Sequence, residues 1–591
     1  MDNQKADGRR RRRLRRDVVG QYVCNPKGTH AGGGHHSLCA AAASGRQSPK
    51  TTTGIVTRHR PCGAIARLSH RATSGDSMTE ETAWEKAASA DGTTSSERAL
   101  ARLARKAFLT LWSYPNVFTD EGRANGKGDG KELCDLLVVF GNDVLLFSDK
   151  DCAYQSNVHV AVAWPRWYRS AIDKSAKQLA GAENFIKAFP KRIFLDKACH
   201  SALPIELPDT SVARYFLIAV TRGAHFSARQ FFGGGSSGSV MLLNQLVGKA
   251  AHAKTPFHIG FPLESRRFVH VLDEMTVDLL LEELDTVPDL VGYLKKKEEF
   301  LQQPGVIVSV PGEEELLARY MSTMHDEEHA FPKTPKGVNF VALPEGDWEV
   351  YRASPQWKAK QKANGISYMW DALIEHQSGF IRSGKAINVP WQPTMDGVNH
   401  ERIVRALAAQ PRLARRSLST DLQVAMHRSD PGRMFARIKM TGRPPDQAFV
   451  FLTIPRTEGE DYNTTYRHRR MHTLTVYCHA VKDGMPTLKE AIGVASEPFS
   501  EGTASQDFMH VDLSEMSDEE LKGWRKQADE LDILRPKTEM KVFRDTEPEF
   551  PAPFRFVDSP PSYIGEAGMP MNRAARRQAD REAHRARKRP R

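Results

Sequence analysis

Charged and polar side chains stand at the ends of two adjacent apolar segments of this chain. Asp135 precedes an apolar run of five residues, and Ser148, Asp149 and Lys150 follow an apolar run of four. Carboxylates are the ligands that a hard, oxygen-seeking cation requires. These residues are therefore the ones from which a cation site with a neighbouring lysine would be built.

The two apolar runs predict a β-hairpin that brings these residues together. The runs 136–140 and 144–147 flank Gly141-Asn142-Asp143, which is typical of a tight turn. Both runs are continuously apolar, so we expect both faces of the strands to be covered, as in the middle of an α/β sheet. Because the open ends of a hairpin lie side by side, Asp135 and Lys150 should meet at one edge of that sheet.

Helices and further strands are predicted on both sides of the hairpin. Thr94 and Glu97 have the spacing of a capping box, which begins a helix with a leucine stripe. A second amphipathic helix is predicted over 164–189. Three later strands are predicted at 192–195, 215–220 and 268–272.

This order of elements and residues resembles the PD-(D/E)XK (restriction-endonuclease-like) nuclease superfamily. That family has an Asp, then Asp/Glu-x-Lys on the next strand, and often a Glu from the preceding helix. Asp135 matches the first Asp, Lys150 matches the Lys, and Glu97 lies on a preceding helix. The resemblance covers about a hundred residues and implies an α/β nuclease-like domain over 93–300.

One position departs from the family pattern. Ser148, not an acid, stands two residues before Lys150. Side chains alternate along a strand, so Ser148 and Lys150 should share a face while Asp149 points to the other face. Three alternatives follow: a β-bulge brings Asp149 in, Glu132 supplies the missing ligand, or metal binding is weakened.

The resemblance implies a Mg²⁺- or Mn²⁺-dependent nuclease that hydrolyses phosphodiesters in nucleic acid, with DNA as the favoured substrate. Asp135, Asp149 and Lys150 would be catalytic. The metal ligands would be drawn from the acids Asp135, Asp149, Glu97 and Glu132. Lys174, Lys177 and Gln178 would meet the phosphates, because nucleases of this type place such residues on the helix after the hairpin. The alternative function is a catalytically inactive nuclease-fold protein that binds or scaffolds.

Each of these residues also has a purely structural interpretation. Glu97 is explained by its capping box, and Asp135 by a loop cap. Lys150 fits a solvated strand end. Lys174 and its neighbours fit the wet face of a helix. We keep both interpretations open at this stage.

A third function is suggested by His325 and His329, which match the H-x-x-E-H pattern of inverted zinc proteases. We expect the preceding helix to continue through this motif until Pro332. A zinc hydrolase would need both histidines on that helix.

The rest of the chain is assigned by composition and periodicity. Residues 1–77 carry a net charge of +11, residues 571–591 carry +7, and the part between carries −6. We expect 1–77 to be a disordered basic arm, or leader sequence before a true start at Met78, and 561–591 to be a disordered basic tail. We expect 301–335 to be a connecting helix and linker.

The remaining segment, 336–560, is expected to be an α+β domain of unknown family. Its helices are predicted at 348–377 and 519–531, and its strands at 434–440, 447–455 and 472–481.

Cysteine usage and hydropathy place the protein in a broad class. The seven cysteines are scattered without pair spacing, which suits reduced thiols and a cytoplasmic location. No run approaches the roughly 20 apolar residues of a transmembrane helix, so we expect no membrane association. The oligomeric state is left open.

Overall fold

The computed structural model describes most of the chain from residue 82 onward. All of the described residues belong to one compact unit, whereas the second unit, Lys27–Glu80, lies outside them. The described ranges are 82–123, 126–233, 239–325, 328–385, 397–428, 432–441, 446–501, 505–534 and 548–551, together with the backbone of three strands at 18–24, 541–545 and 562–564. Within these ranges no helix combines the length and apolar composition needed to cross a bilayer.

The first sheet contains the predicted hairpin and has the strand order β5-β2-β3-β4-β6-β9. Neighbours from β5 to β4 are antiparallel, and β6 and β9 continue parallel to β4. The bounds are β2 (Ser113–Thr119), β3 (Lys131–Phe140), β4 (Asp143–Asp151), β5 (Ile193–Phe194), β6 (Arg214–Arg222) and β9 (His270–Asp273). The turn between β3 and β4 uses Gly141 at φ +58°, a conformation that glycine adopts without strain.

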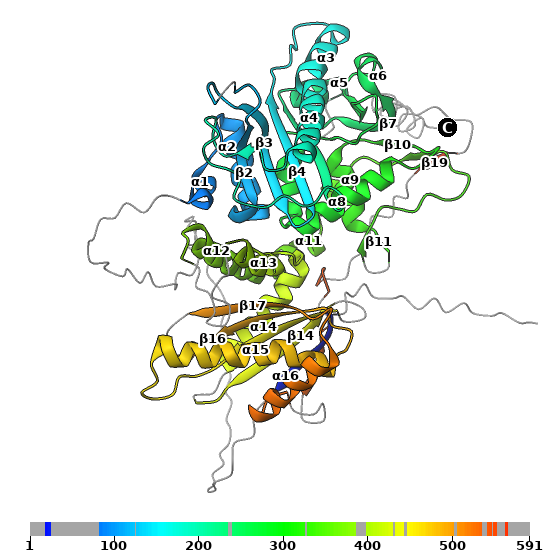
Figure 1. Ribbon diagram of the computed structural model, residues 1–591. Coiled ribbons are helices and arrows are strands. Elements are labelled where there is room, and N and C mark those ends of the chain that lie inside the picture. The colour runs from blue at the N-terminus through cyan, green and yellow to red at the C-terminus, as the bar shows by residue number, and fades with distance from the viewer. Residues whose placement is uncertain are drawn as a thin grey trace, which may run out of the picture. The chain divides into compact units, whose positions relative to one another are not determined.

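Helices cover both faces of this sheet, as the continuously apolar strands predicted. The helix α2 (Ser95–Phe108) covers one face, where its Leu100 packs in one core with Leu136 and Phe147. The helices α3 (Val160–Tyr168) and α4 (Lys174–Ala188) cover the other face, where Leu179 packs with Leu137. Figure 1 shows α4 across β3 and β4.

A second sheet, which was not predicted, is interleaved with the first along the chain. Its order is β19-β13-β10-β7-β8. Its strands are β7 (Met241–Val247), β8 (His258–Phe261), β10 (Ile307–Val310), β13 (Phe340–Ala342) and β19 (Ser562–Ile564). The segment 301–335, which was expected to be a connecting helix and linker, contains the helix α9 (Glu313–Ser322) and also the interior strand β10, which was not predicted. The predicted tail at 561–591 likewise contributes β19, and its other residues lie outside the described ranges.

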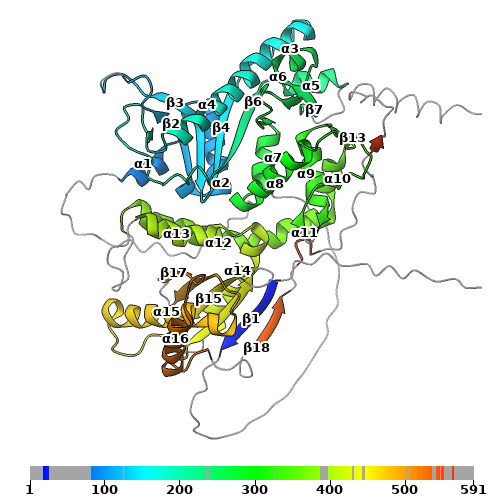
Figure 2. The ribbon, with the colours of Figure 1, turned by 45° about the vertical axis from the view of Figure 1, so that its right-hand side comes forward.

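A third sheet has the order β17-β16-β15-β14-β1-β18. Its strands are β14 (Phe435–Thr441), β15 (Gln447–Thr453), β16 (Glu490–Ser496), β17 (Gln506–Asp512), β1 (Val18–Cys24) and β18 (Lys541–Asp545). Figure 2 shows β1 and β18 side by side at one end of this sheet. The segment 1–77 was expected to lack regular structure, and β1 differs from that expectation. The rest of 1–77 lies outside the described residues.

One predicted strand of this part is a helix. The segment 472–481 lies in α15 (Arg467–Gly484), which connects the parallel strands β15 and β16. Its β-branched and aromatic residues favour a strand locally, but almost every side chain is buried. Two parallel neighbouring strands need a crossover connection, usually a helix, and this requirement decides the conformation here. The helix predicted at 519–531 is present as α16 (Asp518–Glu530).

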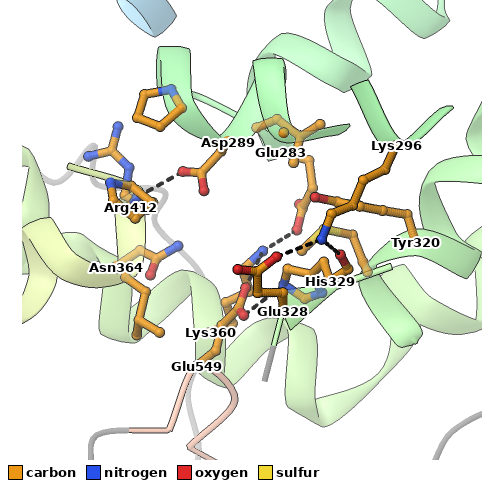
Figure 3. A pocket seen from close by; sticks show the side chains of 16 residues that line it. Glu283, Asp289, Lys296, Tyr320, Glu328, His329, Lys360, Asn364, Arg412 and Glu549 are labelled. Atoms are coloured by element: carbon orange, nitrogen blue, oxygen red, sulfur yellow. Dashed lines mark hydrogen bonds and ion pairs between the residues drawn. The ribbon is translucent and has the colours of Figure 1, made fainter. Parts of the chain in front are cut away.

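Two further groups of helices meet at a buried glutamate. One group is α7 (Thr276–Glu283) and α8 (Val287–Leu301); the other is α10 (Asp347–Ala353), α11 (Pro355–Asn364), α12 (Tyr368–Arg382), α13 (Gly397–Ala408) and α14 (Arg412–Arg428). Glu283 of α7 accepts hydrogen bonds from Tyr351 Oη at 2.7 Å and Trp357 Nε1 at 2.9 Å. It also accepts one from Lys360 Nζ at 2.6 Å (Figure 3). A fourth bond comes from Gln361 Nε2 at 3.3 Å. Four donors on one carboxylate satisfy its buried charge.

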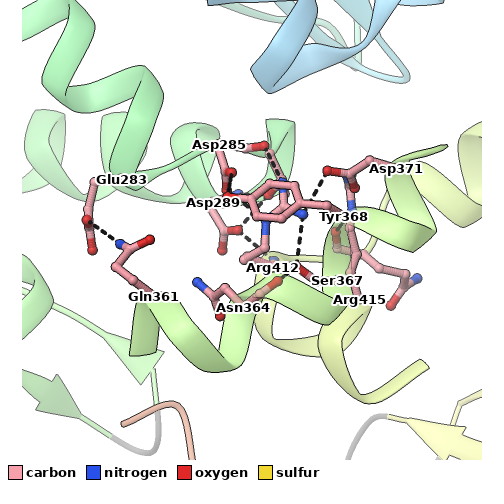
Figure 4. A network of polar contacts seen from close by, with 12 residues as sticks. Glu283, Asp285, Asp289, Gln361, Asn364, Ser367, Tyr368, Asp371, Arg412 and Arg415 are labelled. Carbon is pink, nitrogen blue, oxygen red and sulfur yellow. Dashed lines mark hydrogen bonds and ion pairs between the residues drawn. The ribbon is translucent and has the colours of Figure 1, made fainter. Parts of the chain in front are cut away.

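Two buried arginines form a second junction between the same helices. Arg412 donates to Asp285 at 2.8 Å and to Asp371 at 2.8 Å (Figure 4). Arg415, which is almost fully buried, donates to the other oxygen of Asp371 at 2.7 Å. Arg412 also lies over the ring of Tyr368, with 4.4 Å between the guanidinium and the ring centre. Asp371 is therefore shared by two buried cations.

We predict that Asp371→Ala lowers the free energy of unfolding by about 3–5 kcal/mol, because it leaves Arg412 and Arg415 without their shared buried partner. Chemical denaturation followed by tryptophan fluorescence measures this loss. The control is Arg456→Ala, which removes a solvent-exposed ion pair with Glu501 at 3.8 Å and should change stability by less than about 1 kcal/mol. Equal effects of the two substitutions would contradict the prediction.

Candidate active site

The carboxylate of Asp135 and the ammonium of Lys150 meet at the end of the β3–β4 hairpin, as predicted. Oδ2 of Asp135 accepts a hydrogen bond from the backbone N–H of Asp149 at 2.6 Å and contacts Lys150 Nζ at 3.3 Å. Asp135 is buried, whereas 30% of the Lys150 side chain remains exposed. The pair thus has one side toward the core and one side toward solvent.

Burial raises the pKa of Asp135 above the ordinary aspartate value. Lys150 and the N–H of Asp149 partly offset this rise, and the charge of Glu97 adds to it. Glu97 is thus close enough to act electrostatically on Asp135, although it belongs to α2. The sequence interpretation that places these acids at one site agrees with this coupling.

Glu97 and Glu132 are joined by Asn116, a residue that the sequence analysis did not single out. The Nδ2 atom of Asn116 donates to Glu97 at 3.0 Å and to Glu132 at 2.9 Å. Asn116 has φ +46°, a conformation that asparagine adopts more readily than most residues. An asparagine in the middle of a strand, where this residue type is depleted, was the signal that could have identified it.

The two glutamates differ in their electrostatics. Burial raises the pKa of Glu97, but hydrogen bonds from Asn116, Thr93 and Thr94 outweigh it, so the pKa lies below the ordinary value. The capping box predicted for Glu97 is present. Burial raises the pKa of Glu132, and the charges of Asp135 and Glu97 raise it further, against the hydrogen bond from Asn116. Glu132 is therefore the easier of the two to protonate.

The carboxylate of Asp149 is held by Arg222 of β6, a second residue that the sequence analysis missed. Arg222 donates to both oxygens, with Nε–Oδ1 and Nη2–Oδ2 distances of 3.0 Å, and the Asp149 side chain has 0% exposure. The register of β4 against β6 runs without a shift from Asp143 to Asp151. The alternative that a β-bulge brings Asp149 toward Asp135 is therefore wrong. The negative charge of Asp149 is neutralised by its ion pair with Arg222.

Ser148 takes the orientation that strand alternation predicted. Its hydroxyl oxygen lies 3.2 Å from the hydroxyl oxygen of Ser175 on α4, and both residues are fully buried. Position 148 therefore connects β4 to α4 and supplies no ligand to a cation.

The three predicted phosphate-binding residues lie in the first turns of α4. Lys174 and Lys177 are exposed, and Gln178 is half-buried. Lys177 forms an ion pair with Asp173 at 3.0 Å. Lys150 and Lys174 both lower the pKa of the nearby Cys152, which burial raises. Because both lysines act on Cys152, Lys174 lies at the same end of the sheet as Lys150.

The helix expected to carry His325 and His329 is not present. The helix α9 ends at Ser322, and the two histidines belong to a small antiparallel pair, β11 (Met324–His325) and β12 (Glu328–His329). His329 Nε2 lies 2.8 Å from Glu549, and His325 Nε2 lies 3.2 Å from the carbonyl oxygen of Phe331. Thr323 ends the helix in an extended conformation, with φ −110° and ψ 131°. The zinc-hydrolase motif therefore lacks the helical geometry that it needs.

The donor set at the hairpin suits a hard cation bound partly through water. Asp135, Glu132 and Glu97 each accept their hydrogen bonds through one oxygen, respectively Oδ2, Oε1 and Oε2, which leaves the other oxygen of each carboxylate for a ligand. Mg²⁺ is commonly held by one or two carboxylates, several waters and the phosphates of its substrate. Across the described ranges, no three acidic, histidine or cysteine side chains are close enough to form a complete ligand set. The residues fit a partly hydrated ion and not a closed cage.

Comparison with known proteins adds no assignment: no family model, no curated protein and no solved structure matches the chain. The functional argument therefore depends on the geometry of the site.

The raised pKa of Asp135 predicts a pH-dependent effect of Asp135→Asn. In the unfolded chain this carboxyl has the ordinary pKa near 4, and in the folded chain it holds its proton to higher pH. Stability contributed by the protonated group is therefore lost as the pH rises through the folded-state pKa. Relative to wild type, the variant should gain melting temperature as the pH rises from the ordinary aspartate pKa, near 4, through the higher folded-state pKa of Asp135.

The control for this experiment is Asp209→Asn. Hydrogen bonds from Ser211 lower the pKa of this exposed carboxyl. Its contribution is present above the ordinary pKa, so this variant should lose melting temperature relative to wild type as the pH rises. Parallel pH profiles for wild type and the Asp135 variant would show that Asp135 is not perturbed as described.

Proposed function

We propose that this protein is a metal-dependent nuclease that hydrolyses phosphodiesters in nucleic acid, with DNA as the favoured substrate. The observation that carries the proposal is the convergence of Asp135 and Lys150 at the hairpin end, with Glu97 and Glu132 in electrostatic contact. The succession α2-β2-β3-β4-α3-α4-β5-β6, with β6 parallel to β4, supports the PD-(D/E)XK resemblance.

The residues of the site suggest a division of roles in hydrolysis. Asp135 and Glu97, together with water molecules, would hold Mg²⁺ or Mn²⁺, which when bound would stabilise the developing negative charge and lower the pKa of the attacking water. In the reaction, the water oxygen forms a bond to phosphorus and the water loses a proton, while one P–O ester bond breaks and its leaving oxygen takes up a proton from bulk water. Glu132, with its raised pKa, suits the acceptance of that proton.

The lysines would act on the substrate's charge. The Lys150 ammonium is partly exposed next to Asp135, so it can orient water and contact a phosphate oxygen. Lys174 on α4 would attract the nucleic-acid backbone to the same end of the sheet. The free cysteines of the described ranges suit a reducing compartment, and we therefore place the protein in the cytoplasm.

We predict that the full chain cleaves DNA when Mg²⁺ or Mn²⁺ is added, and that Asp135→Ala and Lys150→Ala each reduce the cleavage rate by about 100-fold or more. Single- and double-stranded DNA and RNA are tested in parallel. The matched control is Lys131→Ala on the same strand as Asp135. Its side chain is 69% exposed and paired with Glu121, so the rate should change less than about two-fold. Cleavage that survives both site substitutions would locate the activity elsewhere.

A second candidate function is nucleic-acid binding without cleavage. The Arg222 clamp on Asp149 and the serine at position 148 favour it, because both remove an acid that the family pattern would place at the metal. Folded wild-type protein that binds DNA but does not cleave it with either metal would support this candidate over the first.

Either function predicts a role for Lys174 that can be measured by binding alone. Lys174→Ala should weaken DNA binding and reduce the slope of log Kd against log salt concentration by about one, because one phosphate contact is lost. Fluorescence anisotropy over a salt series measures the slope. The control is Lys526→Ala on α16, an exposed lysine that pairs with Glu530 and should leave the slope unchanged. An unchanged slope for Lys174→Ala would remove α4 from the binding surface.

A further inference from the structure

A cavity of about 220 Å³ lies among α7, α8, α11 and the start of α14, and is built from elements other than the hairpin. This volume greatly exceeds the roughly 30 Å³ that one water molecule takes. It is smaller than the usual pocket for a drug-sized molecule. Apolar side chains form part of its wall: Leu284, Pro288, Met321, Pro411 and Leu413. A small molecule with a short carbon skeleton is the size of ligand that it can hold.

The cations in the wall of the cavity are already paired within the protein. Lys360 contacts Glu283 at 2.6 Å and Glu549 at 3.6 Å, and Lys296 contacts Glu328 at 2.9 Å (Figure 3). Burial lowers the pKa of Lys360, but Glu283 and Glu549 outweigh this effect and raise it above the ordinary lysine value. The third cation, Arg412, is bound to Asp285 and Asp371 (Figure 4). An anionic ligand would have to compete with these carboxylates.

Asp289 of α8 is half-buried and forms no ion pair with a side chain of the wall, although its charge also acts on Lys360. Its Oδ2 atom accepts hydrogen bonds from Thr286 Oγ1 at 2.6 Å and from the backbone N–H of Arg412 at 2.8 Å. Its Oδ1 atom accepts none from the part of the chain that the structure describes. Both bonds to Oδ2 come from neutral groups, so the negative charge of Asp289 is not neutralised by an ion pair.

Asn364 at the end of α11 is a second polar side chain that faces the cavity. It is 6% exposed, and its side-chain amide makes no hydrogen bond with the described residues. Because the amide lines the cavity, its polar atoms are open to whatever occupies that space. Figure 3 shows Asn364 and Asp289 on the same side of the cavity, with Lys296 and Tyr320 on the other side.

We propose that this cavity binds a small organic amine in its ammonium form. The ammonium donates to Asp289 Oδ1 and to the amide oxygen of Asn364, and its carbon skeleton packs against the apolar wall. These groups satisfy the two polar side chains that the protein leaves without full compensation.

The experiment uses the full chain and three probes of similar size: n-butylamine, putrescine and, as the anionic counterpart, butyrate. Isothermal titration calorimetry measures binding, and thermal unfolding with each probe checks it. We expect saturable binding of at least one amine and none of butyrate. Asp289→Asn should weaken amine binding at least about ten-fold, because the bond to a charged acceptor is lost. The asparagine oxygen can still accept the bonds from Thr286 and Arg412, so the fold should be retained.

Two further variants make the test specific. Asn364→Leu fills the same volume without an amide and should also weaken amine binding at least about ten-fold. Glu328→Gln removes a carboxylate that is 71% exposed and paired with Lys296, and should leave the affinity within about two-fold. The proposal is overturned if neither amine binds to folded wild-type protein, or if both bind Asp289→Asn as tightly as wild type. Nuclease activity is not needed for any of these readouts.

Discussion

The pairing of β3 with β4 is the constraint on which the candidate active site depends. Leu136 lies opposite Phe147, and a two-residue turn fixes this register. The same register puts Asp135 beside the N–H of Asp149 and the ammonium of Lys150. A slip by one residue would turn the apolar side chains of a strand to the wrong faces, and both faces here are packed against helices. Packing of the apolar side chains therefore fixes the positions of Asp135 and Lys150 at the strand ends.

Several buried carboxylates in this protein each accept hydrogen bonds or ion pairs from more than one donor. Glu283 receives four donors, Asp371 receives two arginines, and Asp149 receives both arms of Arg222. Against this background, carboxylates with an oxygen that accepts no hydrogen bond stand out. Asp135 and Asp289 are such residues in the described ranges, and so are Glu97 and Glu132.

The sequence predicted those parts of the fold that follow from local pattern. The hairpin, the capping box at Glu97 and the flanking helices depend on neighbouring residues, and all are present. The prediction failed where contacts between residues far apart in the sequence determine the structure. Nothing near Asp149 in sequence indicates that Arg222, 73 residues later, will neutralise it. Likewise, the crossover between the parallel strands β15 and β16 overrides the strand propensity of 472–481, and short strands such as β10 and β13 carry too few residues to show a period.

The interleaving of the first two sheets has a consequence for how the chain folds. After β6 the chain leaves the first sheet to make β7 and β8, returns for β9, and leaves again for β10. Neither sheet can therefore be completed until strands of the other sheet have been synthesised. Many stabilising contacts join residues far apart in sequence, which slows folding and favours intermediates with unpaired edges. The hairpin with its acids and lysine therefore cannot be separated from the second sheet without loss. A fragment that ends at residue 300 would lack β10, and the edge of β7 that pairs with β10 would be exposed.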